Sequence, residues 1–109
     1  MCGFAGIHSV NQKNIHSEIL LSMSKMLVHR GPDDSGVWIN SSNSIGFAHQ
    51  RLAVIDLTSA GHQPMHSSSN RFTIVFNGEI YNHHELRKEL HCLDWEGHSD
   101  TETLLTCIE

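Results

Sequence analysis

Hydrophobic residues along the chain recur at two different spacings, which predict a mixture of strands and helices. Residues 2–7 alternate small and apolar side chains, as in a buried strand. Apolar residues between positions 15 and 27 recur at helical spacing and predict an amphipathic helix over residues 14–29. The Gly-Pro pair at 31–32 breaks this pattern, so we expect the helix to end before it.

The middle of the chain is patterned for strands. Apolar runs at 37–39 and 45–48, with a polar loop between them, predict two strands of a hairpin. A further apolar run covers residues 52–55. Residues 71–76, with alternate apolar positions on one face, are the clearest predicted strand.

Two helix starts follow near the end of the chain. Asn82 precedes Glu85 by three positions, and Ser99 precedes Glu102 by three. Both pairs fit the capping box, in which the first side chain caps a backbone N–H and the acid reaches back. The order of strand, helix, several strands and two helices predicts a mixed chain of the α+β class with an antiparallel sheet.

Composition narrows the functional classes. The 109 residues hold 7 Lys and Arg against 12 Asp and Glu, a net charge of -5 without a basic run. Nucleic acid and membrane surfaces are therefore poor partners, and no apolar stretch is long enough to span a bilayer. The three cysteines, Cys2, Cys92 and Cys107, contain no closely spaced pair, which favours a reducing, cytoplasmic setting.

The chain carries ten histidines, scattered along its length. The closely spaced pairs are His62 with His66 and His83 with His84. Pro64 disfavours a helix that would bring the first pair to one face, and no cysteine stands at zinc-finger spacing from them. We therefore favour surface histidines over a metal site, although a histidine-based metal binder stays open.

Cys2 is the first candidate for chemistry. If Met1 were removed, Cys2 would carry a free α-amino group, whose ordinary pKa of about 7.7–8.0 lets it act as a base near neutral pH. One residue would then supply both the nucleophile and its base. The simpler interpretation of Cys2 is a small buried hydrophobic residue. Cys92 and Cys107 are interpreted as small residues on predicted helices, with no adjacent base.

Asn77 and Gly78 follow the predicted strand at 71–76. An Asn-Gly pair usually indicates a hairpin turn, but no clear partner strand follows here. An Asn side-chain N–H and a closely approaching Gly backbone N–H could instead hold a developing oxyanion.

Three charged residues complete the candidate set. The planar guanidinium of Arg51 could hold a carboxylate by two parallel hydrogen bonds, or pair with an acid for structure. Asp100 lies in the first turn of the last predicted helix, where it could serve the helix dipole or bind an ammonium group together with Glu79. Taken together, the thiol, the oxyanion donors, the Arg and the acids suit glutamine as a substrate.

The segments that carry a family resemblance occur in order along nearly the whole chain: residues 1–3, 29–33 (His-Arg-Gly-Pro-Asp), 51–56 (Arg-Leu-Ala-Val-Ile-Asp), 61–65 (Gly-His-Gln-Pro-Met), 77–82 with 85–87, and 99–102. They resemble the N-terminal glutaminase domain of class II glutamine amidotransferases, which have the N-terminal-nucleophile hydrolase fold. Within that class, the Arg-Gly-Pro-Asp form favours the glutamine-hydrolysing asparagine synthetases.

The resemblance implies a role for each matching residue. Cys2 would attack the glutamine side-chain amide and release ammonia, and Asn77 and Gly78 would form the oxyanion hole. Arg51 would bind the substrate carboxylate, while Glu79 and Asp100 would bind its amino group. The wall of the pocket would be formed by the backbone of Leu52, Ala53, Val54 and Ile55. The loop at 30–33 would help to shape the site.

The resemblance also implies an architecture and partners. Family members stack two antiparallel sheets between two helical layers, an αββα sandwich, and residues 1–109 would be the first half of such a domain. The glutaminase half is expected to need no cofactor; ATP and Mg belong to the absent C-terminal synthetase domain, which activates aspartate. We expect half a sandwich to hydrolyse glutamine poorly alone and to self-associate through its uncovered strand edges.

Two alternatives to this interpretation stay open. The chain could belong to a class II amidotransferase with another ammonia acceptor, such as a sugar. It could also be a non-catalytic remnant that binds glutamine without turnover.

Overall fold

The computed structural model describes residues 1–11, 13–91 and 94–109. Its larger sheet has three antiparallel strands in the order β1-β3-β2: β1 (Gly3–His8), β3 (Ile45–Arg51) and β2 (Asp34–Ile39). The register pairs Gly3 with Gln50 and Asp34 with Arg51. The start of the chain therefore lies beside the end of the central strand.

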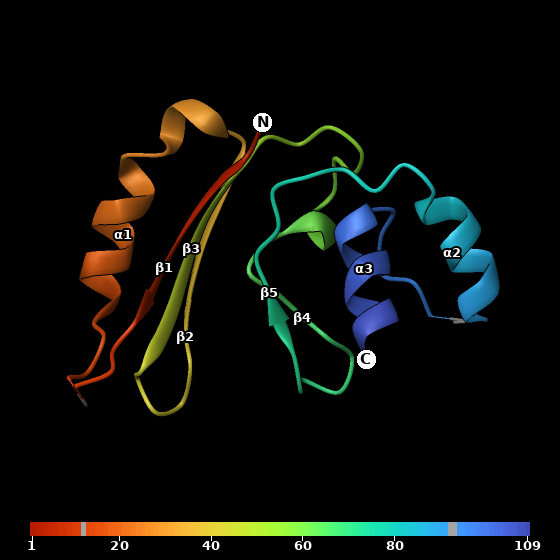
Figure 1. Cartoon of the computed structure of the whole chain (residues 1–109). Coiled ribbons are helices and arrows are strands. Elements are labelled where there is room, and N and C mark those ends of the chain that lie inside the picture. The colour runs from red at the N-terminus through yellow and green to blue at the C-terminus, as the bar shows by residue number, and fades with distance from the viewer. Residues whose placement is uncertain (12, 92–93) are drawn as a thin grey trace.

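One face of this sheet is covered by the helix α1 (Ser17–Lys25) (Figure 1). The core between them consists of Leu20 and Ala48, both fully buried, with Ile15 and the half-buried Ile7 and Ile39. Alternate residues of each strand point to this face, as the period of a strand requires. The helix and the sheet thus share a small apolar core.

The opposite face of the sheet looks toward a second, smaller layer (Figure 1). This layer contains the two-stranded antiparallel sheet of β4 (Met65–His66) and β5 (Thr73–Ile74), followed by α2 (His83–Leu90) and α3 (Asp100–Ile108). Two short 3₁₀ helices, η1 (Val28–Arg30) and η2 (Ser59–Gly61), lie in the connections. The chain is therefore an α+β protein with antiparallel sheets, as the sequence predicts.

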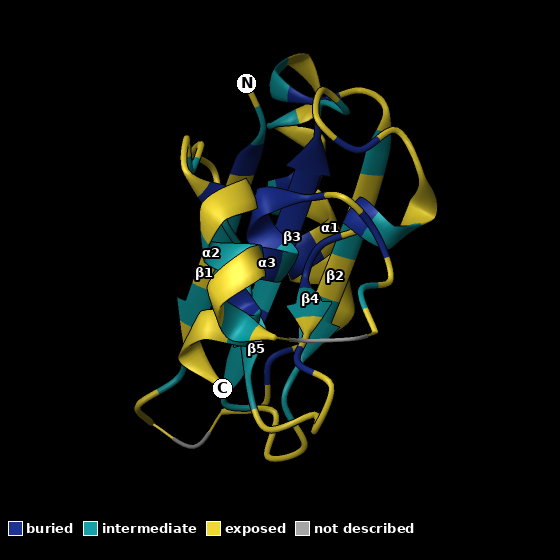
Figure 2. Ribbon diagram, turned by 90° about the vertical axis from the view of Figure 1, so that its right-hand side faces the viewer, coloured by how far each residue is buried: buried dark blue, intermediate teal, exposed yellow. Residues whose placement is uncertain are grey.

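Aromatic side chains link the two sheets. Trp38 of β2 stacks on Phe47 of β3, with ring centroids 5.7 Å apart, and meets the ring of His66 of β4 edge-on at 6.0 Å. Figure 2 shows buried residues concentrated along β3, the strand between the helix and the second layer. The central strand thus contributes to both interiors of the molecule.

Arg87 of α2 fixes the segment that leads into α3. Its guanidinium pairs with Glu102 at 3.0 Å, donates to the backbone oxygens of Gly97 and Ser99 at 2.8 and 2.9 Å, and lies 4.0 Å from the ring centroid of Trp95. The planar group uses several donors at once. One side chain therefore ties α2, the loop and α3 together.

The first predicted helix is longer than the observed one. The N–H of Ile15 donates to the backbone oxygen of Asn43 at 2.8 Å, so the chain before Ser17 is held against the hairpin loop rather than in a helix. At the other end, Arg30 donates to Leu27 with 3₁₀ spacing at 2.8 Å. Helix ends often tighten in this way.

The predicted strand at 71–76 is wrong in length, because β5 covers only Thr73 and Ile74. The N–H of Phe72 donates to the Ser67 hydroxyl at 3.2 Å and that of Phe76 donates to the Gln63 side chain at 2.6 Å. These N–H groups are thus bonded to side chains rather than to a strand. The apolar run at 52–55 also contains no strand.

The two predicted capping boxes differ. The Ser99 hydroxyl accepts from the N–H of Glu102 at 3.2 Å, which confirms the first half of that box. The Glu102 carboxylate does not complete it, since it accepts instead from the N–H groups of Glu96 and Gly97. Asn82 makes no side-chain cap to α2.

Within the described residues, no helix has the length and apolar character needed to cross a bilayer.

We expect Leu20→Ala to lower the free energy of unfolding by about 2–5 kcal/mol, because it removes a fully buried side chain and leaves a cavity between α1 and the sheet. Urea unfolding measures the loss. Ile19→Ala is the matched control, since Ile19 is 54% exposed on the same helix. Equal losses in the two variants would contradict the described core.

Candidate functional site

The pairing of β1 with β3 places Cys2 beside Arg51. Because Gly3 pairs with Gln50, the residue before Gly3 lies opposite the residue after Gln50. The side chain of Gln50 points to α1, where it donates to the Ser24 hydroxyl at 2.7 Å. Cys2 and Arg51, one position along each strand, therefore face the second layer.

The Cys2 thiol contacts the backbone at the end of β3. Its sulfur accepts from the N–H of Leu52 at 3.3 Å and donates to the backbone oxygen of the same residue at 3.6 Å. Cys2 itself is half-buried. The sulfur thus has a fixed position with one side open.

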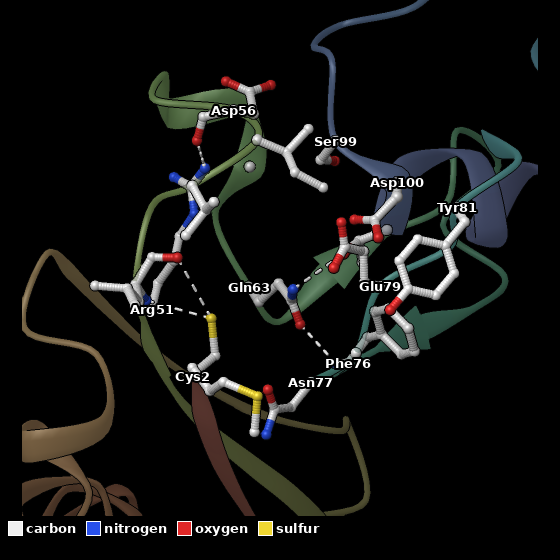
Figure 3. Close-up of a pocket in the computed structure, with 17 residues that line it drawn as sticks. Cys2, Arg51, Asp56, Gln63, Phe76, Asn77, Glu79, Tyr81, Ser99 and Asp100 are labelled. Atoms are coloured by element: carbon white, nitrogen blue, oxygen red, sulfur yellow. Dashed lines mark hydrogen bonds between the residues drawn. The ribbon is translucent and has the colours of Figure 1, made fainter. Parts of the chain in front are cut away.

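A pocket of about 460 Å³ opens next to this thiol (Figure 3). Nine of the ten residues that the sequence singles out line it: Cys2, Arg51, Leu52, Val54, Ile55, Asn77, Gly78, Glu79 and Asp100. They come from the start, the middle and the last part of the chain, and from both layers. The volume is within the range of small-molecule sites.

Ala53 is the predicted residue that does not line the pocket. Its backbone N–H donates to the Asp33 carboxylate at 2.8 Å. The N–H of Asp33 in turn donates to the backbone oxygen of Arg51 at 3.0 Å. The loop at 30–33 thus supports the segment behind the pocket, and a Cβ on its Gly31 would lie 2.6 Å from the Leu52 nitrogen.

The Arg51 guanidinium is buried, and some of its N–H groups are hydrogen-bonded to the backbone of the next loop. It donates to the backbone oxygen of Thr58 at 2.8 Å and to that of Asp56. An Arg side chain has five N–H donors, so these two bonds leave three of them for other partners, and Arg51 itself lines the pocket. Gly61 makes room for this group, because a Cβ there would lie 2.6 Å from Cζ of Arg51.

Asp56 anchors the same loop to the second layer. Its carboxylate accepts from the N–H and hydroxyl of Thr58, at 2.8 and 2.6 Å, and from the N–H of His98 at 2.7 Å. Burial alone would raise the pKa of Asp56, but these hydrogen bonds outweigh it and lower the pKa to about 2. The carboxylate is therefore charged at neutral pH and holds the segment before α3.

The acidic end of the pocket is formed by Asp100 and Glu79. Asp100 is the first residue of α3 and is 5% exposed; its Oδ2 accepts from the N–H of Ile80 at 2.8 Å. Glu79 is exposed. Figure 3 shows these two carboxylates at one end of the pocket, with Asn77 and Cys2 at the other.

Several lining residues are absent from the set that sequence reasoning assigned to the site. They include Met1, Asp56, Gly61, Gln63, Phe76, Tyr81, Ser99 and Thr101. Gln63 belongs to the segment 61–65, and Ser99 and Thr101 flank Asp100 in the segment 99–102. Membership in these ordered segments is the sequence signal that could have identified Gln63, Ser99 and Thr101 as site residues.

His49 of β3 lies between Phe47 and Arg51 on the face toward the second layer and is fully buried. Burial lowers its pKa, against the smaller opposing effects of the nearby Phe76 backbone and Asp34. The Phe76 backbone lies near the ring without hydrogen-bond geometry, and neither ring nitrogen has a partner among the described residues. The imidazole is thus favoured in its neutral form.

Among the described residues, the remaining histidines and Cys107 give no candidate metal centre. In residues 1–11, 13–91 and 94–109, no group of three or more His, Cys, Asp and Glu side chains could hold a metal ion. His62 pairs with Asp34 at 2.7 Å. Cys107 is exposed on α3, as predicted for a helix, and Cys92 lies outside the described residues.

Comparison with known proteins identifies the family. Residues 1–109 match the family of glutamine amidotransferase domains over their whole length. The chain belongs to this family.

Its relatives include asparagine synthetase [glutamine-hydrolyzing] 1 of Bacillus subtilis (strain 168), 39% identical over 94% of this chain and 16% of that protein. Asparagine synthetase [glutamine-hydrolyzing] 1 of Arabidopsis thaliana is 41% identical over 100% of this chain and 18% of that protein. A putative asparagine synthetase [glutamine-hydrolyzing] 2 of Methanocaldococcus jannaschii is 41% identical over 96% of this chain and 23% of that protein. The chain therefore spans less than a quarter of the length of these relatives.

We expect Gly61→Ala to lower the free energy of unfolding by about 1–3 kcal/mol, because the new Cβ overlaps the buried guanidinium of Arg51. Gly6→Ala is the control, since its Cβ would meet the Phe47 ring at 3.3 Å and that ring can shift. Urea unfolding compares the two variants. A Gly61→Ala chain as stable as the parent would contradict the close packing on Arg51.

We expect the buried His49 to make stability depend on pH. The unfolded chain binds a proton at this side chain below about pH 6.5, whereas the lowered pKa of the folded state resists protonation. Above that pH, His49 is neutral in both states and the free energy of unfolding is at its full value. As the pH falls toward the folded pKa, protonation of the unfolded chain lowers the free energy of unfolding by up to about 1.4 kcal/mol per pH unit.

Unfolding free energies of the parent and of His49→Leu, measured from pH 5 to pH 8, check this expectation. The difference between the two chains isolates His49 from His83, whose pKa is also lowered, chiefly by burial. His8→Leu, at an exposed position of β1, is the control. Parallel pH curves for the parent and His49→Leu would refute the assignment.

Proposed function

We propose that this chain is the glutamine-hydrolysing part of an asparagine synthetase and that Cys2, once Met1 is removed, is its nucleophile. The observation that carries the proposal is the shared pocket, in which the thiol, the Asn-Gly pair, one guanidinium and two acids meet. Its support from relatives is that each of those named is a glutamine-hydrolysing asparagine synthetase, one of them putative.

Glutamine fits the charges of the pocket. Its α-carboxylate would accept N–H bonds from Arg51, and its α-ammonium would lie between Glu79 and Asp100. The dipole of α3 favours a negative charge at its first residue, the position of Asp100. Leu52, Val54 and Ile55 would form the wall along the aliphatic part of the substrate. An amino acid held at both charged ends presents its side-chain amide to the thiol.

The reaction would proceed through a thioester. The α-amine of Cys2 accepts the thiol proton, and the sulfur attacks the amide carbon, forming the C–S bond. The negative charge that develops on the amide oxygen is stabilised by the side-chain N–H of Asn77 and the backbone N–H of Gly78. The ammonium of Cys2 returns its proton to the leaving nitrogen, the C–N bond breaks and ammonia departs. Water then cleaves the thioester to glutamate and restores the thiol.

The remaining parts of the proposal concern the larger protein. α1, the two sheets and the α2–α3 pair follow one another as layers in Figure 1, which supports the first half of an αββα sandwich. The ammonia would pass to an ATP-activated aspartate in a synthetase domain outside these residues. Glutaminase chemistry by the chain itself would need no cofactor.

A second candidate is glutamine binding without turnover. Met1 precedes the nucleophile and lines the pocket. With Met1 retained, the nitrogen of Cys2 is part of an amide and cannot accept the thiol proton. The chain would then keep its clamps for the charged ends of glutamine but lack the base.

Covalent labelling separates these candidates. We expect a diazo-ketone analogue of glutamine to modify Cys2 in the chain that lacks Met1, and glutamine to slow this modification, because both compete for the same clamps. Mass spectrometry of the peptides locates the adduct. Cys2→Ala should abolish labelling, while Cys107→Ala, at an exposed thiol, should leave it unchanged.

Two results would count against catalysis by Cys2. Modification at Cys107 with the same rate as at Cys2 would show general thiol reactivity. Equal labelling of chains with and without Met1 would show that the free amine of Cys2 is not the base.

A further inference from the structure

Gln63 stands in the wall of the pocket and is 6% exposed. Its side-chain oxygen accepts from the backbone N–H of Phe76 at 2.6 Å. Its side-chain nitrogen donates to the hydroxyl of Thr101 at 3.2 Å. In Figure 3 it lies between the Cys2–Asn77 end of the pocket and the Asp100–Glu79 end.

The two partners of Gln63 are neighbours of the two ends of the proposed site. Phe76 precedes Asn77, a proposed oxyanion donor, and Thr101 follows Asp100, a proposed ligand of the substrate amine. One carboxamide group therefore connects the end that would hold the reacting amide with the end that would hold the α-ammonium. A buried amide that is bonded through both its oxygen and its nitrogen is a rigid spacer, because breaking either bond leaves a polar group unsatisfied.

The segment that carries Asn77 and Gly78 needs such support. β5 ends at Ile74 and α2 begins at His83, so residues 75–82 lie outside regular structure. Asn77, Gly78 and Glu79 are all exposed. The N–H bonds of Phe76 to Gln63 and of Ile80 to Asp100 flank these three residues. The Gln63 bond is the one on the side of the oxyanion donors.

We propose that Gln63 is a positioning residue that sets the distance between the oxyanion donors and the amine-binding acids, and so selects glutamine over asparagine. The inference rests on the proposed function. The two amino acids differ by one methylene between the α-carbon and the reacting amide. A site that clamps both ends discriminates between them by its length, provided that this length is rigid.

The test uses the chain lacking Met1 and two diazo-ketones, the analogues of glutamine and of asparagine. The rate of Cys2 modification against reagent concentration gives an inhibition constant and a maximal rate for each. Gln63→Met keeps the length of the side chain and removes both hydrogen bonds. Thr101→Val keeps the shape of Thr101 and removes only the bond to α3.

For Gln63→Met we expect the second-order rate with the glutamine analogue to fall about tenfold, as for two lost hydrogen bonds. The rate with the asparagine analogue should change less than about twofold, so that selectivity collapses. For Thr101→Val we expect a raised inhibition constant and a nearly unchanged maximal rate, because only the amine-binding end loses its support.

Gln50→Met is the matched control. Gln50 is also 6% exposed and bonded through its side-chain nitrogen, but to Ser24 on the α1 face of the sheet. We expect it to change stability and to leave the selectivity between the two reagents as in the parent. Equal losses with both reagents in Gln63→Met, matching those of Gln50→Met, would overturn the proposal and leave Gln63 a structural role.

A measurement without reagent keeps this inference separate from the proposed function. Amide resonances of Gly78 and Asp100 are compared by NMR in the parent, Gln63→Met and Gln50→Met. Shifted resonances at both residues in Gln63→Met, but not in Gln50→Met, support the spacer. Failure of the parent to label at Cys2 would count against the glutaminase proposal and would leave this support for the spacer intact. Unchanged resonances at either residue would overturn the spacer whatever the labelling shows.

Discussion

The antiparallel pairing of β1 with β3 is the constraint on which the site depends. It is a register of six consecutive pairs, from Gly3 with Gln50 to His8 with Ile45. Because side chains alternate between faces, a slip of one residue would turn Cys2 toward α1 and away from the pocket. The core residues Leu20, Ala48 and Ile7 oppose such a slip, since it would also turn the apolar face of β1 outward. A small apolar core on one face thus fixes the position of a thiol on the other.

Polar contacts also hold the second layer to the sheet, beside the aromatic contact of Trp38 with His66. Arg51 binds the loop that contains Asp56 and Thr58, and Asp56 binds the backbone of His98 just before α3. Buried polar groups of this kind specify one geometry, because every broken bond leaves a desolvated partner. The buried face of the pocket is therefore built from the same groups that join the layers.

The sequence predicted the parts of the structure that follow local pattern. The helix α1, the strands β2 and β3 and the Ser99 cap arise from apolar spacing and short-range capping, and all are observed. The strand at 71–76 was wrong in length because side chains bond its outer N–H groups: Ser67, five residues before Phe72, and Gln63, thirteen residues before Phe76. Nine of ten chosen residues line one pocket, but Ala53 does not, and Gln63 was missed as a site residue. Contacts between segments far apart in sequence have no periodic signal.

The location of Met1 has a practical consequence. Its side chain lines the same cavity as Cys2, so the chain enters its own pocket from the amino end. Met1 is 76% exposed, so any tag or fusion partner attached ahead of it would begin beside that space and would keep the nitrogen of Cys2 in an amide. Purification handles for this protein therefore belong at the other terminus.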